Sequence, residues 1–465
     1  MRYISTRGGI QPLQFKDAVM MGLATDGGLL LPQSYPLISS KQLNEWRQLN
    51  YPELAFEIIS RYVDDIPADS LRVLINNSYA TFTHPEVTPV VRKDGVYILE
   101  LFHGVTMAFK DVALQFLGNV FEYILTERSQ KLNIIGATSG DTGSAAIQGV
   151  RGKQGINIFI LHPHGKTSPV QALQMTSVTD SNVHNIAIRG TFDDCQNMVK
   201  AFFNDLEFKE KYSLGAVNSI NWARVLAQVV YYFYAWMKVS ENTDQKVSFA
   251  VPTGNFGDIF AGYVAKRMGL PIEKLLLATN ENNILTRFVN SGDYSLTDVV
   301  STASPSMDIQ VASNFERYLY LLFNENPAKV KAAFSELKEQ GRISFTAEEM
   351  ARVQSEFCSA SVNQLETLKE ISEFYTETGY LLDPHTAVGV SAARQILPAD
   401  AIRICLSTAH PAKFGEAVEK AIGKSAPVPK IIADLEGLPT RCELMDADIE
   451  QVRAFFVAKL IQVDD

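Results

Sequence analysis

The chain has 465 residues, 46% of them hydrophobic and 20% charged, with a formal net charge of -10. Because hydrophobic cores stop growing at roughly 250–300 residues, two or three domains are expected. The acidic balance argues against DNA or RNA as a partner, since a nucleic-acid-binding protein needs a basic face. No run of about 18 apolar residues is present, so no membrane partner is expected.

The remaining composition predicts an ordinary protein of the cytoplasm. Met1 to Gly9 contains no apolar signal core. The four cysteines are scattered without a Cys-x-x-Cys pair, and the seven histidines do not pair at metal-ligand spacing. We therefore expect neither a disulfide framework nor a metal site.

Residues 1–93 mix short helical patterns with turns and are expected to form a separate N-terminal α+β domain. The turn at residues 25–28 leads into a short apolar strand at residues 29–31. Residues 50–63 have the apolar spacing of a helix, with Pro52 in a tolerated position of the first turn.

From about residue 94, short apolar runs alternate with helical patterns. The expected strands are residues 96–102, 132–137, 156–161, 184–188, 247–251, 275–278 and 402–406. The expected helices are residues 112–125, 142–150, 170–175, 192–203, 256–268, 282–289 and 413–420. This alternation predicts parallel sheets in two α/β domains, residues 94–240 and 241–465. A long apolar helix at residues 220–239 separates the two series, and residues 315–378 are expected to be a helical insertion in the second.

Lys110 lies between the strand at residues 96–102 and the helix at residues 112–125. A lysine kept dry at such a junction can lose its proton and attack a carbonyl to form a Schiff base. Alternatively, its stem packs against the fold while the ammonium reaches water. The motifs that follow along the chain favour the first interpretation.

Two turns rich in small and hydroxyl residues follow expected strands directly. The first is Thr138-Ser139-Gly140-Asp141-Thr142, and the second is Thr253-Gly254-Asn255-Phe256-Gly257-Asp258. Such turns direct backbone N–H groups at a helix N-terminus, where a carboxylate or phosphate binds. A tight capped connection without any ligand remains the alternative for each turn.

Polar residues also occur at the last strand and at the long helix. Ser407 and Thr408 end the strand, at the edge where open parallel sheets bind ligands. Asn221 and Arg224 begin the apolar helix, and Lys413 follows Thr408. If the substrate carries a phosphate, an acidic chain must present a local cation to the dianion, and Arg224, or Lys413 as the alternative, is the candidate. Helix capping or an ion pair is the other interpretation.

One lysine, two anion-binding turns and a hydroxyl at a strand end are what pyridoxal 5'-phosphate requires. The lysine takes the aldehyde, one turn takes the phosphate, the hydroxyl faces the ring nitrogen, and the other turn takes the substrate carboxylate. A nucleotide-binding α/β protein is poorly supported, since no Gly-x-x-x-x-Gly-Lys motif is present. The intact Lys110 argues against a protein without enzymatic activity that only binds a ligand.

These motifs closely resemble the threonine synthase family of fold-type II pyridoxal-phosphate enzymes. The matching segments occur in the order of the family: residues 22–28, 102–111, 138–143, 253–258 and 407–413. Val105 and Met107 depart from the family pattern, where many relatives carry Pro and Leu. The resemblance implies two parallel-rich αβα domains like those of the tryptophan synthase β subunit, with an N-terminal α+β extension and a helical insertion.

The resemblance also implies an activity and roles for residues. Lys110 would form the Schiff base, and Gly254, Asn255, Phe256, Gly257 and Asp258 would hold the cofactor phosphate. Thr408 would face the pyridine nitrogen, and the turn from Thr138 to Thr142 would bind the substrate carboxylate. O-phospho-L-homoserine would be converted to L-threonine and phosphate. A related phospho-lyase that releases a keto acid stays open as an alternative, and a monomer or homodimer is expected.

Overall fold

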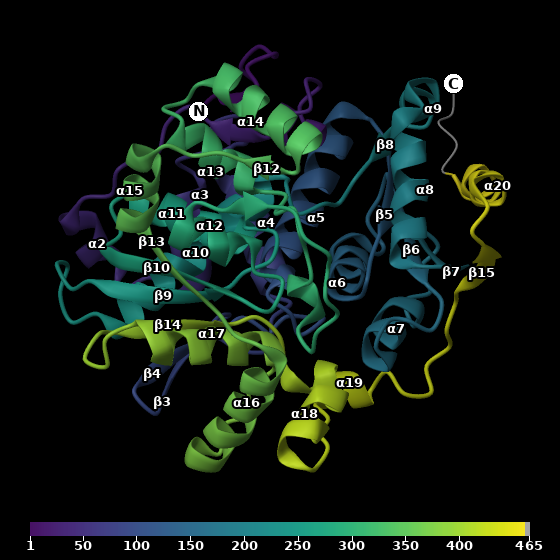
Figure 1. Ribbon diagram of the computed structural model, residues 1–465. Helices are drawn as coiled ribbons and strands as arrows, with labels where there is room; N and C mark the ends of the chain where they lie inside the picture. Colours follow the sequence, from purple (N-terminus) through teal and green to yellow (C-terminus); the bar gives the residue numbers. More distant parts are fainter. Residues whose placement is uncertain (461–465) are drawn as a thin grey trace. The chain divides into compact units, whose positions relative to one another are not determined.

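The computed structural model describes residues 1–460, which belong to two compact units (Figure 1). Both units are assembled from separate stretches of the chain. Unit 1 comprises residues 1–75, 82–103 and 219–426, and unit 2 comprises residues 76–81, 104–218 and those from 427 onward. The chain therefore passes repeatedly from one unit to the other.

Unit 1 is built on a six-stranded sheet in the order β13-β10-β9-β14-β4-β3. Its strands are β13 (Phe357–Ser361), β10 (Ile272–Thr279), β9 (Val247–Pro252), β14 (Arg403–Ser407), β4 (Val96–Glu100) and β3 (Val90–Lys93). All neighbours are parallel except β3, which runs antiparallel to β4. Every residue of β9 and β14 is buried, as expected for central strands covered on both faces.

Helices and an N-terminal layer complete unit 1. The N-terminal elements are β1 (Tyr3–Ser5), α1 (Phe15–Met21), β2 (Leu30–Pro32), α2 (Ser40–Trp46), α3 (Tyr51–Ile59) and most of α4 (Ala68–Tyr79). The later helices are α10 (Trp222–Val239), α11 (Gly257–Arg267), α12 (Ile284–Ser291), α13 (Phe315–Leu322), α14 (Pro327–Gln340), α15 (Ala347–Glu356), α16 (Gln364–Thr378), α17 (Pro384–Ile396) and α18 (Gly415–Ile422). Short elements are η1 (Pro305–Met307), η2 (Pro411–Phe414), β11 (Tyr294–Ser295) and β12 (Arg342–Ile343). Helix α10 packs between α3 and α11, which explains why all its residues from Trp222 to Trp236 are buried.

Unit 2 is built on a five-stranded parallel sheet in the order β15-β7-β6-β5-β8. Its strands are β15 (Glu443–Asp446), β7 (Val183–Arg189), β6 (Ile156–Pro163), β5 (Leu132–Ala137) and β8 (Leu214–Gly215). Its helices are α5 (Lys110–Arg128), α6 (Asp141–Val150), α7 (Pro169–Thr176), α8 (Phe192–Asn204), α9 (Leu206–Lys211), α19 (Lys430–Ala433) and α20 (Ile449–Lys459).

Helices α5 and α6 approach each other closely at a pair of glycines. A Cβ added to Gly118 would lie 1.9 Å from the carbonyl oxygen of Gly149, and one added to Gly149 would lie 2.6 Å from that of Leu114. No larger residue fits at either position. This contact fixes how the two helices lie, and their first residues, Lys110 and Asp141, carry the polar groups described below.

The parallel α/β character predicted from the sequence is confirmed, and two details are corrected. Within residues 315–378, expected to be helical, β13 is an edge strand paired with β10. Its sequence, Phe-Cys-Ser-Ala-Ser, has no apolar run that would have identified a strand. The predicted boundaries at residues 93 and 240 also differ from the compact units, because β4 and α10 belong to unit 1. Within residues 1–460, no helix is long and apolar enough to cross a membrane.

Candidate active site

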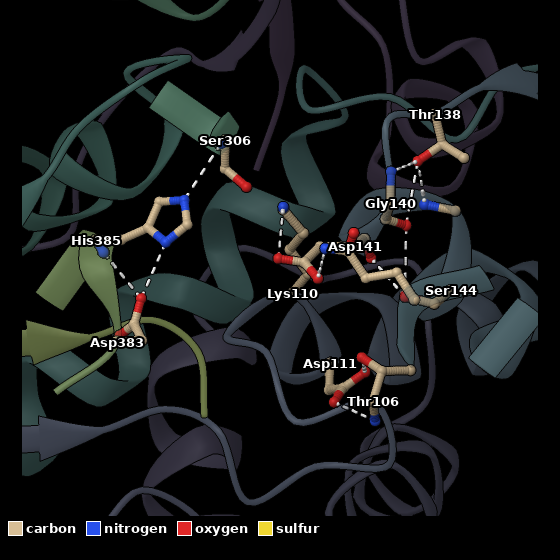
Figure 2. Close-up of polar contacts among 12 residues, drawn as sticks. Thr106, Lys110, Asp111, Thr138, Gly140, Asp141, Ser144, Ser306, Asp383 and His385 are labelled. Carbon is tan, nitrogen blue, oxygen red and sulfur yellow. Dashed lines mark hydrogen bonds and ion pairs between the residues drawn. The ribbon is translucent and has the colours of Figure 1, made fainter. Parts of the chain in front are cut away.

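Lys110 is the first residue of α5, and the turn before it is held in a strained conformation (Figure 2). Met107 has φ of 59°, a left-handed conformation that a non-glycine residue rarely adopts. Asp111 is fully buried and stabilises this turn, because it accepts hydrogen bonds from the Thr106 backbone N–H (2.8 Å) and hydroxyl (2.7 Å). The segment that presents Lys110 is therefore fixed from both sides of the lysine.

The Lys110 side chain faces the carboxylate of Asp141, with 3.8 Å between Nζ and Oδ2. Both side chains are largely buried, with exposed fractions of 12% and 4%. The other oxygen of Asp141 accepts a hydrogen bond from Gln171 Nε2 at 2.8 Å. The Asp141 side chain thus lies between Lys110 and Gln171. Its predicted place in the turn that binds the substrate carboxylate stays a prediction.

The turn that follows β5 is shaped by the Thr138 hydroxyl. Thr138 Oγ1 accepts hydrogen bonds from the backbone N–H groups of Gly140 (3.0 Å) and Gly143 (2.9 Å). Gly140 has φ of 155°, and a Cβ there would lie 2.3 Å from Gln171 Oε1, so only glycine fits. The Thr138 hydroxyl thus supports the turn from within. Ser139 is exposed and Thr142 half-buried, so these two side chains and the N-terminus of α6 remain the candidates for a carboxylate.

In unit 1, the turn at residues 253–258 forms a cradle at the N-terminus of α11. Phe256 adopts φ of 62° as the N-cap residue, and its ring is buried against Phe315, Tyr318 and Phe357. Gly254 lies against a backbone, because a Cβ there would be 2.6 Å from the Ser306 carbonyl oxygen. The first N–H groups of α11 have no partner within the helix, and its dipole favours an anion. The backbone of this turn suits a phosphate, whereas the Phe256 side chain belongs to the core.

The Asp258 side chain is hydrogen-bonded to α10. Its Oδ1 accepts hydrogen bonds from the hydroxyls of Tyr231 (2.6 Å) and Tyr232 (2.8 Å), both on α10. Burial raises the pKa of the Asp258 carboxyl to about 6, although the two tyrosine hydroxyls act in the opposite direction. The Asp258 side chain therefore ties the start of α11 to α10. The predicted role of Asp258 in holding the cofactor phosphate stays a prediction.

Asn255 is held by a neighbouring segment. Its carbonyl oxygen accepts the backbone N–H of Asn314 (3.0 Å), and its Oδ1 accepts the hydroxyl of Ser313 (3.2 Å). Asn314 is fully buried and also donates from Nδ2 to the Ser219 carbonyl oxygen (3.0 Å). The cradle is thus supported by Ser313 and Asn314.

Thr408 directly follows β14, at the carboxyl edge of the sheet, and is 6% exposed. Its neighbour Ser407 lies 3.1 Å from the Thr386 hydroxyl, which donates to Asp383. A neutral hydroxyl at this edge has the character expected of a partner for a ring nitrogen. Its predicted contact stays a prediction.

Sequence reasoning missed a buried chain of polar groups that begins at Asp383 (Figure 2). Asp383 Oδ1 accepts a hydrogen bond from His385 Nδ1 at 2.9 Å, and His385 Nε2 accepts one from the Ser306 backbone N–H at 3.2 Å. The local sequence Asp-Pro-His-Thr predicts a helix start with Asp383 as the N-cap. Nothing in the sequence relates His385 to Ser306, which lies 79 positions earlier.

The three remaining predicted site residues are all buried in unit 1. The Asn221 side chain caps α10 through Ala223 N–H (3.1 Å) and donates to the Val19 carbonyl oxygen (2.9 Å), which indicates a structural role. Arg224 is 5% exposed on α10, and burial lowers its pKa to about 10. Lys413, in η2, is 1% exposed. The roles of Arg224 and Lys413 toward a substrate stay predictions.

The described residues fit pyridoxal phosphate. Unit 2 brings together Lys110, Asp141 and the turn after β5, which supply an amine and an anion-binding helix start. Unit 1 contains the Gly254 cradle, where a Cβ would meet the Ser306 backbone, and the hydroxyl-bearing end of β14. Within residues 1–460, no group of three or more His, Cys, Asp or Glu side chains could hold a metal ion.

Three family models match successive parts of the chain. "Threonine synthase N terminus" matches residues 2–79, "Pyridoxal-phosphate dependent enzyme" matches residues 82–326, and "Threonine synthase, C-terminal" matches residues 386–456.

Known proteins are similar over nearly the full length. Threonine synthase of Schizosaccharomyces pombe is 48% identical, over 90% of this chain and 89% of that protein. Threonine synthase of Pseudomonas aeruginosa is 46% identical, over 98% of both chains. The X-ray crystal structure of PLP-bound threonine synthase from Brucella melitensis has a TM-score of 0.97 and 46% identity, covering 99% of this chain and 100% of that one.

Proposed function

The chain belongs to the threonine synthase family, and we propose that it converts O-phospho-L-homoserine and water to L-threonine and phosphate. It is a pyridoxal-phosphate-dependent lyase. The observation that most supports the proposed substrate is the likeness to threonine synthases over the whole chain, with Lys110 intact at the start of α5.

The proposal assigns each side of the cofactor to particular residues. Lys110 would hold the cofactor aldehyde, and the backbone of the Gly254 cradle would hold the cofactor phosphate. Thr408 would be the neutral partner of the ring nitrogen. Bound pyridoxal phosphate supplies the electron sink that makes protons of an amino acid substrate removable at carbon.

The chain's own residues do the positioning and the proton transfer. Ser139, Thr142 and the N–H groups at the start of α6 hold the substrate carboxylate. The Lys110 amine would accept and return protons at the substrate carbons. Asp141, fixed by Gln171, keeps that amine in one position. Overall, the substrate loses phosphate from Cγ and gains a hydroxyl from water at Cβ.

Product analysis tests the proposal. The purified protein with bound cofactor is incubated with O-phospho-L-homoserine, and threonine, inorganic phosphate and keto acid are measured together. Threonine and phosphate released in equal amounts are expected. Phosphate accompanied by a keto acid would identify the phospho-lyase alternative. If neither threonine nor phosphate is released, the proposal that O-phospho-L-homoserine is the substrate is refuted.

The same proposal includes the cellular location and the oligomeric state of the enzyme. A small, soluble metabolite as substrate agrees with a location in the cytoplasm. A monomer or a homodimer is proposed as the assembly, which sedimentation of the purified protein measures.

A further inference from the structure

We propose that His385 is a positioning residue for the cofactor phosphate, acting through the Ser306 backbone on the Gly254 cradle. The inference rests on the proposed role of that cradle. It concerns a histidine that forms no part of the assigned cofactor or substrate contacts.

His385 is held by groups that fix its orientation and its tautomer. It is 3% exposed, and its ring packs against Phe414 with 4.7 Å between centroids. Nδ1 lies 2.9 Å from Oδ1 of Asp383, which is fully buried, so the ring proton is placed on Nδ1. Nε2 is then an acceptor.

The acceptor nitrogen of His385 takes the backbone N–H of Ser306 at 3.2 Å. Ser306 lies in the middle of η1, and its own carbonyl oxygen is what a Cβ at Gly254 would meet at 2.6 Å. One peptide segment thus touches the histidine with its N–H and packs on the cradle with its C=O. Movement of Ser306 toward residue 254 would narrow the cradle.

The flanks of η1 are anchored independently of the histidine. Asn280 donates to Ser304 Oγ (2.9 Å) and to Asp308 Oδ1 (2.7 Å), and Asp308 Oδ2 accepts the Thr302 N–H (2.9 Å). These contacts hold the ends of the segment, whereas His385 holds its centre. Loss of His385 is therefore expected to displace Ser306 locally and to leave the remainder of unit 1 folded.

Removing the acceptor leaves the Ser306 N–H without its partner in a part-buried position. The cost of such a lost hydrogen bond corresponds to about a 10-fold change in an equilibrium constant. Because Ser306 lies against the cradle, that change is expected in the binding of the phosphate, with little effect on the aldehyde end of the cofactor.

The test compares pyridoxal phosphate with pyridoxal, which lacks the phosphate. Dissociation constants of both are measured on cofactor-free wild type and on His385→Leu, His385→Gln, Gly254→Val and Ile371→Ala. His385→Leu is expected to raise the dissociation constant of pyridoxal phosphate about 10-fold and that of pyridoxal less than about 2-fold. His385→Gln, which can again accept from Ser306, is expected to restore most of the preference for the phosphate.

Ile371→Ala is the control for a general loss of stability. Ile371 is fully buried in the core cluster that also contains residues of α17, such as Val388. Its melting temperature is expected to fall while its preference for pyridoxal phosphate over pyridoxal is unchanged.

The outcomes separate two failures. In the first case, Gly254→Val loses the preference for pyridoxal phosphate over pyridoxal. The role of His385 is then refuted if His385→Leu keeps that preference, or if it weakens the binding of both ligands equally. If Gly254→Val also keeps the preference, the phosphate binds elsewhere, and both the cradle assignment and the inference drawn from it are refuted.

Discussion

Replacement of Asp258 by Asn is expected to remove a pH-dependent loss of stability from the cradle. In the unfolded chain the carboxyl titrates near 3.8, whereas burial raises its pKa in the fold to about 6. The folded state therefore holds a proton that the unfolded state has lost between these pH values. The associated stability is fully present below pH 3.8 and is lost as the pH rises through 6.

The magnitude follows from the two pKa values. A rise from 3.8 to about 6 corresponds to about 3 kcal/mol of unfolding free energy lost by pH 8. About half of this loss falls between pH 5 and pH 8. In Asp258→Asn, Oδ1 still accepts from Tyr231 and Tyr232, but the new amide N–H groups lie where Oδ2 has no hydrogen-bond partner among the described residues. That burial costs about 1–3 kcal/mol and offsets part of the gain at pH 8.

Urea unfolding of the cofactor-free protein from pH 5 to pH 8 measures the effect. The unfolding free energy of Asp258→Asn relative to wild type is expected to increase steadily with pH. Tyr231→Phe is the matched control, because losing one donor should move the titration of Asp258 to higher pH. A difference between Asp258→Asn and wild type that does not change with pH would refute the reasoning.

Three further substitutions test individual site residues. Lys110→Ala should lower kcat about 1000-fold or more with an unchanged circular dichroism spectrum, because the amine that links the cofactor and transfers protons is lost. Thr408→Asp should raise the pKa of the ring nitrogen and increase transamination at the expense of threonine, measured as the product ratio. An unchanged ratio would place Thr408 away from the ring. Arg224→Leu should raise KM for O-phosphohomoserine about 10-fold or more without changing cofactor affinity. A wild-type KM would refute the role of Arg224, and Lys413 would be substituted next.

Features set by neighbouring residues were predictable from the sequence. Lys110 was expected at a strand–helix junction because an apolar run and a helical pattern flank it, and α5 does begin there. The turn residues Gly140 and Gly254 were expected at strand ends for the same reason, and both lie where a larger residue would clash.

Features set by distant residues were not predictable. The direction of the Asp258 side chain depends on two tyrosines of α10, 26 and 27 positions earlier. Asp141 lies in the turn predicted to bind the substrate carboxylate, and the partner of its side chain, Gln171, comes from the next helix, α7. The contact of His385 with Ser306 joins residues that are 79 positions apart in the sequence. Periodicity and turn composition describe local backbone, and they contain no information on which side chains meet after folding.

Identification of the lysine that carries the cofactor tests the central claim most directly. The purified enzyme with bound cofactor is reduced with borohydride, which fixes the covalent link, then digested and analysed by mass spectrometry. The pyridoxyl group is expected on the peptide that contains Lys110 and to be absent from the Lys110→Ala protein. A pyridoxyl group on a different lysine, or the same modification in Lys110→Ala, would contradict the account.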